Sequence, residues 1–316
     1  MDRVIILLAA YNGENYIADQ IESIINQDYK YWKLIISDDC STDNTFTICK
    51  AYEEKDARIL AIRQNRNYGA LENFNKLICF AKENYHEKYF MFSDQDDVWY
   101  SDKISSCIVR IDMIKDKMPL LLYTSKQYVD ANLNLLNVVI KGEESIKLSN
   151  LLHQNMAYGC TMLFNDSLCD LINDIPKDFI NHDHYIMFTA FLFGKALFYQ
   201  RKTLLYRQHT KNVSGNIYRS VLSKIFSRED IKKNVELFFF TVNYCCKYIN
   251  LLNQEERKMI LDIQNKIIKN NVFISYYLYI YKVKKNTSLS TLNFYFEITK
   301  IMIYRNIACQ KERYDK

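Results

Sequence analysis

The chain has 316 residues, of which 49% are hydrophobic and 25% charged, so wholesale disorder is excluded and a catalytic domain with an appendage is expected. Its formal net charge of +5 is uneven, because residues 217–316 carry a balance of +9 and the first 216 residues carry −4. Only two prolines and six glycines occur, which excludes long linkers rich in either residue.

The first hundred residues alternate strand and helix patterns. A continuous apolar run at Val4–Ala10 predicts a strand buried on both faces, and isoleucines at helical spacing between positions 17 and 25 predict the helix that follows. Further strands are expected at 33–37, 59–62 and 89–93, with helices between them. This alternation predicts an α/β fold with a mostly parallel sheet flanked by helices.

Beyond residue 102 the pattern loosens. We expect a helix near 104–114 and another at 184–193, and strands at 120–129, 157–164 and 196–207, whereas residues 132–155 look irregular. After position 215 the sequence is helical and aromatic. We therefore expect a catalytic domain at residues 1–215 and a helical, basic C-terminal extension at residues 216–316.

Two acidic clusters follow expected strands. Asp38 and Asp39 come after the second strand, and residues 94–97 (Asp-Gln-Asp-Asp) come after the fourth. Ligands of open parallel sheets bind at the carboxyl ends of the strands, where clustered carboxylates favour a bound Mg²⁺ or Mn²⁺. The alternative is that these acids are solvated turn residues. Because no glycine-rich phosphate-binding loop is present, a metal is the expected means of holding a diphosphate.

Six motifs occur in a fixed order along the chain. They are Ala10-Tyr11-Asn12-Gly13, Ser37-Asp38-Asp39-Cys40-Ser41-Thr42-Asp43, Asn67-Tyr68-Gly69 with Asn73, Ser93-Asp94-Gln95-Asp96-Asp97-Val98-Trp99, His182-Asp183-His184 and Tyr206-Arg207-Gln208-His209. In this order they resemble the family 2 glycosyltransferases of GT-A fold, particularly the rhamnosyltransferase-like members. The resemblance covers roughly the first 215 residues.

The resemblance implies which residues bind the nucleotide. Tyr11 and Asp39 would hold a pyrimidine, the ring offering a face and the carboxylate accepting the base N–H. Asp94 would contact the ribose or a metal-bound water. The other implied nucleotide-binding residues are Ala10, Asn12, Asn67, Gly69 and Arg207, the last of them as a partner of the diphosphate.

The resemblance also implies two ligands for one metal ion and a general base. Asp96 and His209 would hold Mn²⁺ or Mg²⁺, which offsets the charge of the leaving nucleoside diphosphate; a histidine after a strand can equally be structural. Asp183 would take the proton of the attacking acceptor hydroxyl in a single displacement that inverts the anomeric centre. Its alternative role is a helix N-cap.

Two departures from relatives are informative. The processive synthases carry a Gln-x-x-Arg-Trp motif that is absent here, so transfer of one sugar is expected. Cys40 stands where many relatives have glycine, which predicts an altered turn geometry with function retained.

The C-terminal region joins aromatic and basic residues. Phenylalanines at 238–240 and tyrosines at 276–281 accompany Lys282, Lys284 and Lys285. Such a segment can lie in the headgroup region of a membrane, or its aromatic rings can form a helical cap or a homodimer contact. The basic residues show no recognised nucleic-acid-binding module, so no nucleic acid partner is expected.

The location follows from three features. The first strand begins near the N-terminus without a signal peptide, no run of 18 apolar residues occurs, and nine cysteines include no Cys-x-x-Cys pair. They predict a cytoplasmic protein, for which a peripheral position at the inner face of the cell membrane stays open.

These observations predict an inverting, metal-dependent glycosyltransferase of bacterial surface polysaccharide synthesis. Its donor would be a dTDP- or UDP-sugar, with L-rhamnose from dTDP-rhamnose the first expectation, and its acceptor a glycan or lipid-linked saccharide. Two alternatives stay open. A sugar nucleotidyltransferase normally brings a Gly- and Arg/Lys-rich first loop, which residues 10–15 lack, and a non-catalytic scaffold would lose acids that this chain retains.

Overall fold

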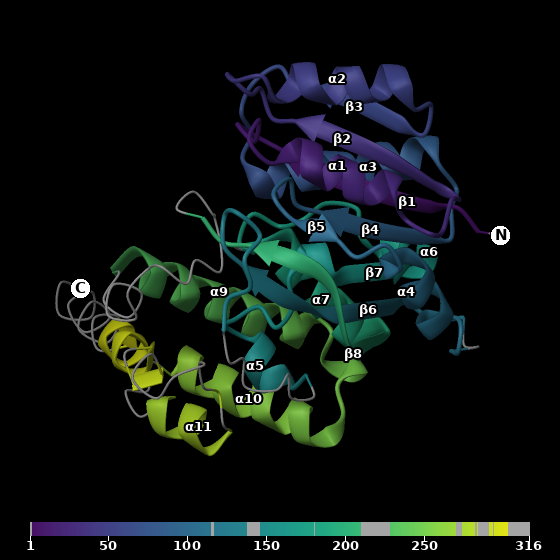
Figure 1. The fold of residues 1–316 in the computed structure, drawn as a ribbon. Coiled ribbons are helices and arrows are strands. Elements are labelled where there is room, and N and C mark those ends of the chain that lie inside the picture. Colours follow the sequence, from purple (N-terminus) through teal and green to yellow (C-terminus); the bar gives the residue numbers. More distant parts are fainter. Residues whose placement is uncertain are drawn as a thin grey trace. The chain divides into compact units, whose positions relative to one another are not determined.

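The structure is a computed structural model that describes residues 2–114, 117–137, 146–179, 181–209, 228–269, 274–281, 283, 291–292 and 294–302. It divides into two compact units (Figure 1). The first comprises residues 1–145 and 157–218, and the second comprises residues 146–156 and 219–316. The expected boundary after residue 215 falls between 210 and 227, outside the described residues.

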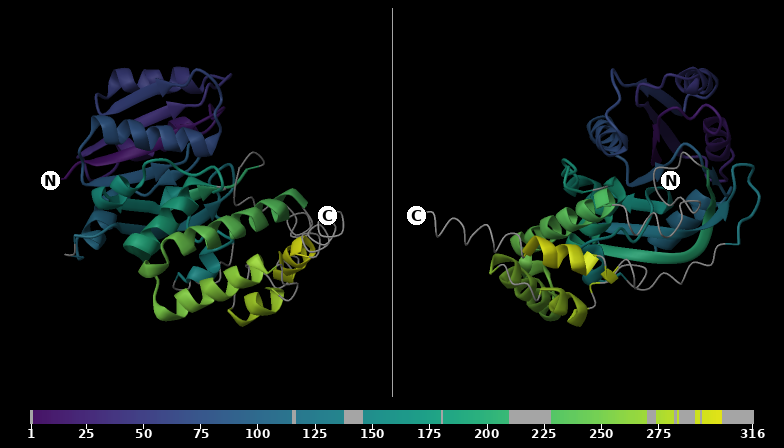
Figure 2. Two further views of the ribbon diagram at one scale, coloured as in Figure 1. Left: turned by 180° about the vertical axis from the view of Figure 1, so that it is seen from behind. Right: turned by 90° about the vertical axis from the view of Figure 1, so that its left-hand side faces the viewer.

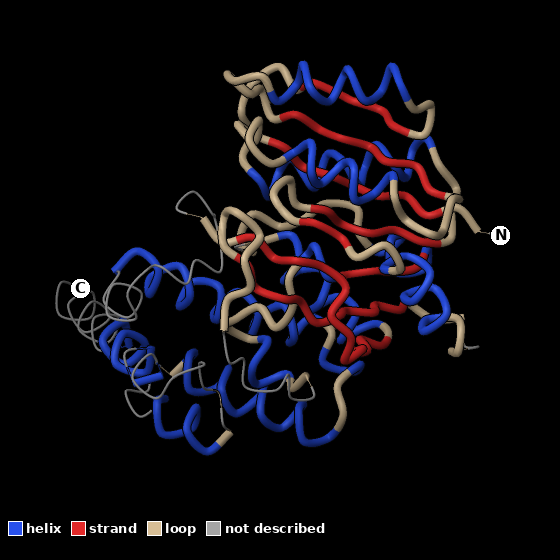
Figure 3. The backbone as a smooth tube through the Cα atoms, in the orientation of Figure 1, coloured by secondary structure: helices blue, strands red, loops and turns tan. Residues whose placement is uncertain are grey.

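The first unit is built on one sheet with the strand order β3-β2-β1-β4-β7-β6-β8-β5 (Figure 3). Strands β3, β2, β1 and β4 are parallel, β7 is antiparallel to both β4 and β6, β8 is parallel to β6, and β5 is antiparallel to β8. The strands are β1 Val4–Ala10, β2 Trp32–Asp38, β3 Ile59–Arg63, β4 Tyr89–Ser93, β5 Val98–Trp99, β6 Leu120–Val129, β7 Met162–Asn165 and β8 Lys195–Arg207. The expected mostly parallel sheet is confirmed, with its parallel part at the N-terminal end.

Helices cover both faces of this sheet (Figure 2). Helices α1, α2 and α4 pack on one face, where they share a core cluster with β1 and β2, while α3, α6 and α7 pack together on the other. The helices are α1 Ile17–Ile25, α2 Thr45–Lys55, α3 Ala70–Asn84, α4 Lys103–Ile111, α6 Asp166–Leu171 and α7 His182–Phe193.

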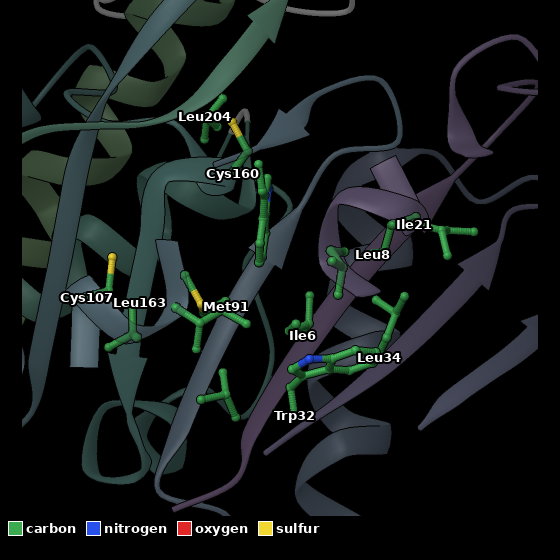
Figure 4. Close-up of a cluster of buried hydrophobic side chains, with 14 of the residues drawn as sticks. Ile6, Leu8, Ile21, Trp32, Leu34, Met91, Cys107, Cys160, Leu163 and Leu204 are labelled. Carbon is green, nitrogen blue, oxygen red and sulfur yellow. The ribbon is translucent and has the colours of Figure 1, made fainter. Parts of the chain in front are cut away.

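The alternation of side chains along β1 explains the two layers. Ile6 and Leu8 belong to the cluster that includes Ile21 of α1 and Leu34 of β2 (Figure 4). The residue between them, Leu7, is fully buried and points to the other face. A strand buried on both faces is therefore apolar without interruption, as the sequence of Val4–Ala10 is.

One expected strand is shorter than its apolar pattern suggested. Residues 157–164 were expected to form a strand, but Gly159–Thr161 forms a 3-10 turn and β7 covers only Met162–Asn165. The turn forms because the backbone N–H and the hydroxyl of Thr161 both donate to the carbonyl of Tyr158. This turn places Gly159 and Cys160 beside the acidic loop after β4, as described below.

The second unit is helical, as expected for the C-terminal extension. Its elements are α5 Leu148–Leu151, α9 Arg228–Lys247, the 3-10 turn η2 Ile249–Leu251, α10 Gln254–Ile268, α11 Ile274–Ile280 and a helical stretch at 294–302. Helix α10 begins with a capping box, in which the Asn253 side chain accepts from the N–H of Glu256 and the Glu256 side chain accepts in return. Phe238 and Phe294 pack edge to face in its core.

Two features of this unit bear on the expectations for the C-terminal region. Lys282, Lys284 and Lys285, with the side chains of the tyrosines at 276 and 277, lie outside the described residues. Among the described residues, no helix combines the length and apolarity that a membrane span requires.

Candidate functional site

Three neighbouring parallel strands present their carboxyl ends at one edge of the sheet. In the order β2-β1-β4, the loop after β1 lies between the two acidic loops that follow β2 and β4 (Figure 1). The two strands that precede the acidic loops, β2 and β4, both pair with β1 and not with each other. The edge therefore holds three loops in the order acidic, aromatic, acidic.

Of the first acidic pair, Asp38 supports the fold. It is fully buried, its Oδ2 accepts from the backbone N–H of Ser41 at 3.1 Å, and it pairs with Nε of Arg63 at 3.7 Å. Between these residues Cys40 adopts a φ of 62°, the left-handed conformation that favours glycine. The turn therefore holds a cysteine in a strained conformation that glycine adopts readily.

Asp39 links several of the predicted nucleotide-binding residues. Its backbone N–H donates to the carbonyl of Ala10 at 2.8 Å, and its Oδ2 accepts from the N–H of Gly69 at 2.8 Å. Oδ1 accepts from the N–H of Tyr68 at 2.9 Å, and the side chain of Asn67 accepts from the same Gly69 N–H at 3.0 Å. The structure brings Ala10, Asp39, Asn67 and Gly69 into one network.

The loop after β1 exposes an aromatic ring. Asn12 has a φ of 47°, its N–H donates to Oγ of Ser41 at 2.9 Å, and its Oδ1 accepts from the N–H of Thr42 at 2.8 Å. The amide of Asn12 therefore fixes the loop, and Tyr11, the residue before it, is 43% exposed. A planar ligand can reach that ring.

Three carboxylates from two distant segments, the loop after β4 and helix α7, converge at the end of β4. Burial, followed by the negative charges of Asp96 and Asp183, raises the pKa of Asp94 to about 7. The ammonium of Lys126 on β6, held among the rings of Tyr158 and Tyr206, acts in the opposite direction. The acids are therefore close enough to repel one another, as ligands of a cation would be.

The described residues also contain one cluster with metal-ligand geometry. Ligand-type atoms of Asp94, Asp97 and Cys160 lie within 4.8 Å of one another. Burial raises the pKa of the Cys160 thiol well above its ordinary value, so the thiol is protonated and offers a hard cation little. The useful donors are the two carboxylates, and the buried Oδ2 of Asp97 has no hydrogen-bond partner. This arrangement fits a divalent cation with oxygen ligands.

The predicted metal ligands, Asp96 and His209, lie side by side. Their Oδ2 and Nε2 atoms are 2.8 Å apart, and the side chains are only 15% and 11% exposed. The imidazole stacks on the ring of Tyr16, with centroids 4.7 Å apart. The fold thus joins the loop after β4 to the segment after β8 at this pair.

Arg207 is engaged by protein groups. Its side chain is 4% exposed, and its Nε, Nη1 and Nη2 donate to the carbonyl of Asp96, the carbonyl of Ala131 and the carboxylate of Asp19. Its backbone N–H donates to Asp97 at 3.2 Å. The structure gives the predicted partner of the diphosphate a supporting position behind the acidic loop.

Asp183 lies in the first turn of α7. The N-cap of this helix is Asn181, so the alternative role of Asp183 as the N-cap does not apply. Its Oδ1 accepts from the N–H of His184 at 2.8 Å, and its Oδ2 accepts from the N–H of Gly159 at 3.2 Å. Gly159 is required there because a Cβ would lie 2.5 Å from Nε2 of His182.

Four residues of the site received no role from the sequence. Gln95 and Asp97 lie in the motif in which only Asp94 and Asp96 were given roles. Gly159 and Lys126 belong to none of the six motifs. The sequence pattern does not single out Lys126, because a lone lysine in a strand normally faces solvent. Spatial proximity alone identifies Lys126, which is 6% exposed.

Comparisons with known proteins identify relatives of this chain. A family model for glycosyl transferase family 2 matches residues 5–169, just over half of the chain. The chain is 32% identical over 225 residues to the dTDP-rhamnosyl transferase RfbG of Shigella flexneri, covering 66% of this chain and 73% of that protein. It is 28% identical over 256 residues to the UDP-Glc:alpha-D-GlcNAc-diphosphoundecaprenol beta-1,3-glucosyltransferase WfaP of Escherichia coli, covering 78% and 96%.

A solved structure shows the same fold. S. aureus TarS 1–349 in complex with UDP-GlcNAc aligns with a TM-score of 0.58 at 16% identity, over 82% of this chain and 70% of that chain. The GT-A fold expected from the motifs is thereby confirmed. Because the family model covers more than half of the chain and a relative is 32% identical, the chain belongs to glycosyltransferase family 2.

Proposed function

We propose that this glycosyltransferase moves one sugar from a nucleoside-diphosphate sugar to an acceptor hydroxyl, with inversion and with help from a divalent metal. The observation that carries the proposal is the gathering of acids at the end of β4, where ligand-type atoms of Asp94 and Asp97 lie within 4.8 Å of each other and Asp96 contacts His209 at 2.8 Å. The likeness to a protein named as a dTDP-rhamnosyl transferase makes dTDP-L-rhamnose the first donor to test.

The base of the donor would lie against Tyr11 and Asp39. Each oxygen of the Asp39 carboxylate accepts one backbone N–H, which leaves lone pairs for the N–H of a pyrimidine. The exposed ring of Tyr11 can stack on the same base. Asn67 and Gly69 support this pocket by fixing the loop that holds Asp39.

The diphosphate would lie over the acidic loop after β4. Asp96 and His209 would hold the metal, with Asp94 beside them as a contact to the ribose or to a metal-bound water. When bound, Mn²⁺ or Mg²⁺ supplies positive charge that offsets the charge of the leaving nucleoside diphosphate. We assign Arg207 a positioning role in place of the predicted contact with the diphosphate, because its donors already bind protein acceptors.

Asp183 would act as the general base. The carboxylate accepts hydrogen bonds from two backbone N–H groups, which orient it. The acceptor oxygen would give its proton to Asp183 while it attacks the anomeric carbon opposite the diphosphate, and one displacement inverts that centre.

The acceptor would be a glycan or a lipid-linked saccharide. One relative is named for transfer to a diphosphoundecaprenol-linked sugar, which supports the lipid-linked class. A peripheral contact of the second unit with the inner face of the membrane would bring such an acceptor to the enzyme, and a homodimer contact is the competing role for the same surface.

The test is thermal-shift binding of UDP-, dTDP- and GDP-sugars, each with Mn²⁺ and with EDTA. We expect one nucleotide series to raise the melting temperature, and only with metal, because a ligand of the folded state stabilises it by mass action. Asp96→Ala should abolish the metal-dependent part of the shift. An intact protein that no nucleotide stabilises would contradict the proposal and favour the scaffold alternative.

A further inference from the structure

The side chain of Gln95 spans two loops of the site. Its Oε1 accepts from the N–H of Tyr11 at 2.8 Å, and its Nε2 donates to the carbonyl of the same residue at 3.0 Å. Gln95 itself stands between Asp94 and Asp96 in the acidic loop after β4. One amide thus closes a two-bond bridge between the base-side loop and the metal-side loop.

Gly13 lies directly against this bridge. A Cβ built at Gly13 would lie 2.2 Å from Oε1 and 2.4 Å from Cδ of Gln95. The φ of Gly13 lies outside the left-handed region, so its backbone conformation is open to other residues. A side chain at this position would therefore require the Gln95 amide to move.

The same loop is fixed from its other side by the turn after β2. Three consecutive backbone N–H groups donate to side-chain oxygens of that turn at 2.8–3.2 Å: Asn12 to Ser41, Gly13 to Thr45 and Glu14 to Asp43. The loop is therefore rigid on the Asp39 side, and the Gln95 bridge is what ties it to the acidic loop on the opposite side.

We infer that Gln95 is a positioning residue that sets the spacing between the base pocket and the diphosphate pocket. The inference rests on the proposed function, since it assumes that Tyr11 with Asp39 and Asp94 with Asp96 bind the two ends of one donor. A nucleoside diphosphate links those ends covalently, so its affinity depends on how well the two pockets are spaced. Separate fragments bind each pocket without needing that spacing.

The experiment measures how tightly Gln95→Met binds a nucleoside diphosphate and how tightly it binds the separate nucleoside and pyrophosphate fragments. Methionine keeps the length of the side chain and removes both hydrogen bonds. We expect about a tenfold loss of affinity for dTDP or UDP with Mn²⁺, by calorimetry, and less than about a threefold loss for thymidine, uridine or Mn²⁺-pyrophosphate. Gln254→Met, at an exposed glutamine of the second unit, is the matched control.

A second variant reaches the bridge from the opposite loop. Gly13→Ala should displace the Gln95 amide and lower the affinity for the nucleoside diphosphate by a similar factor. In a Gln95→Ala background the same change should have little further effect, because the clashing group is gone. This double-mutant cycle distinguishes an effect that acts through the Gln95 bridge from a general disturbance of either loop. It remains informative even where Gln95→Met lowers the stability of the protein.

Three results would overturn the inference. Equal losses for the nucleoside and for the nucleoside diphosphate would make Gln95 a part of the base pocket alone. Unchanged binding of all ligands would remove any role of the bridge, and additive effects of Gly13→Ala and Gln95→Ala would mean that they act independently. Failure of the wild-type chain to bind any nucleoside diphosphate would instead overturn the proposed function and the inference with it.

Discussion

At the scale of single residues, Asp183 is the proposed general base. Its carboxylate is held by the N–H groups of His184 and Gly159 at the start of α7, and it is 7% exposed. Asp183→Asn keeps the shape of the side chain and removes the base. We expect kcat to fall by roughly 10²–10⁴-fold with donor affinity unchanged, measured as release of nucleoside diphosphate in the presence of acceptor. Full activity of this variant would exclude the base assignment.

The acidic loop predicts a pH dependence of stability without metal. The folded-state pKa of Asp94, raised to about 7, lies above that of an exposed aspartate, so the folded chain holds a proton that the unfolded chain releases. Asp94 should therefore contribute a fall in stability of about 2–4 kcal/mol as pH rises between about 4 and 7. Buried His182, whose pKa is lowered to about 3, acts in the opposite direction over part of this range. Relative to the wild type, Asp94→Asn should gain stability as pH rises, measured in urea titrations at several pH values. A difference between the two proteins that does not change with pH would exclude this contribution of Asp94.

The turn after β2 offers a test of backbone strain. Cys40 has a φ of 62°, and non-glycine residues in that region carry a strain of about 1–2 kcal/mol. We expect Cys40→Gly to raise the free energy of unfolding by about 1 kcal/mol, since the added entropy of the unfolded chain offsets part of the relief. Chemical denaturation measures it, and a loss of stability would mean that the thiol packing outweighs the strain.

At the scale of elements, Arg207 joins parts that are remote in sequence. Its guanidinium contacts Asp19 of α1, the carbonyl of Ala131 after β6 and the carbonyl of Asp96 after β4. Lysine cannot reproduce this planar set of donors. Arg207→Lys should therefore lower the free energy of unfolding by about 2 kcal/mol and weaken metal-dependent nucleotide binding.

The control for Arg207→Lys is Arg201→Lys, which changes an exposed arginine of β8 that pairs with Asp102. A surface ion pair contributes about 0–1 kcal/mol, so this variant should stay near wild type in stability and binding. Equal effects of the two substitutions would show that the three contacts of the buried Arg207 side chain stabilise the fold no more than a surface ion pair does.

At the scale of the whole molecule, charge separates the two units. Residues 217–316 carry the positive balance, and helix α10 exposes Leu261 and Ile268, seven residues apart on one face, with Lys258 beside them. We expect the full chain to sediment with vesicles containing phosphatidylglycerol at ~50 mM salt and to be released at ~500 mM, where screening is strong. Neutral phosphatidylcholine vesicles should retain little protein.

A charge reversal sharpens this experiment. Lys258→Glu on α10 should weaken vesicle binding, while Lys30→Glu, an exposed lysine of the first unit, should leave it unchanged. Concentration-dependent self-association without vesicle binding would favour the homodimer role of the second unit.

The sequence by itself determined the parallel part of the fold and the chemical types at the site. Four strands of the first hundred residues were predicted to within one residue at each end, because a strand buried on both faces is a short apolar run with polar ends. The acidic clusters likewise predicted Asp39, Asp94 and Asp96 at the sheet edge, since they follow buried strands directly, whereas Asp183 at the start of α7 was predicted from the resemblance alone.

Only the tertiary structure decided which of these polar residues are held by other protein groups and which lie where a ligand could contact them. Asp38 is occupied by its own turn, Arg207 by three protein acceptors, and Gln95 by the Tyr11 backbone, 84 residues away along the chain. The sequence pattern reports burial and local conformation, whereas such partnerships depend on how strands are ordered across the sheet. The role of each polar group at this edge is therefore fixed by the fold that surrounds it.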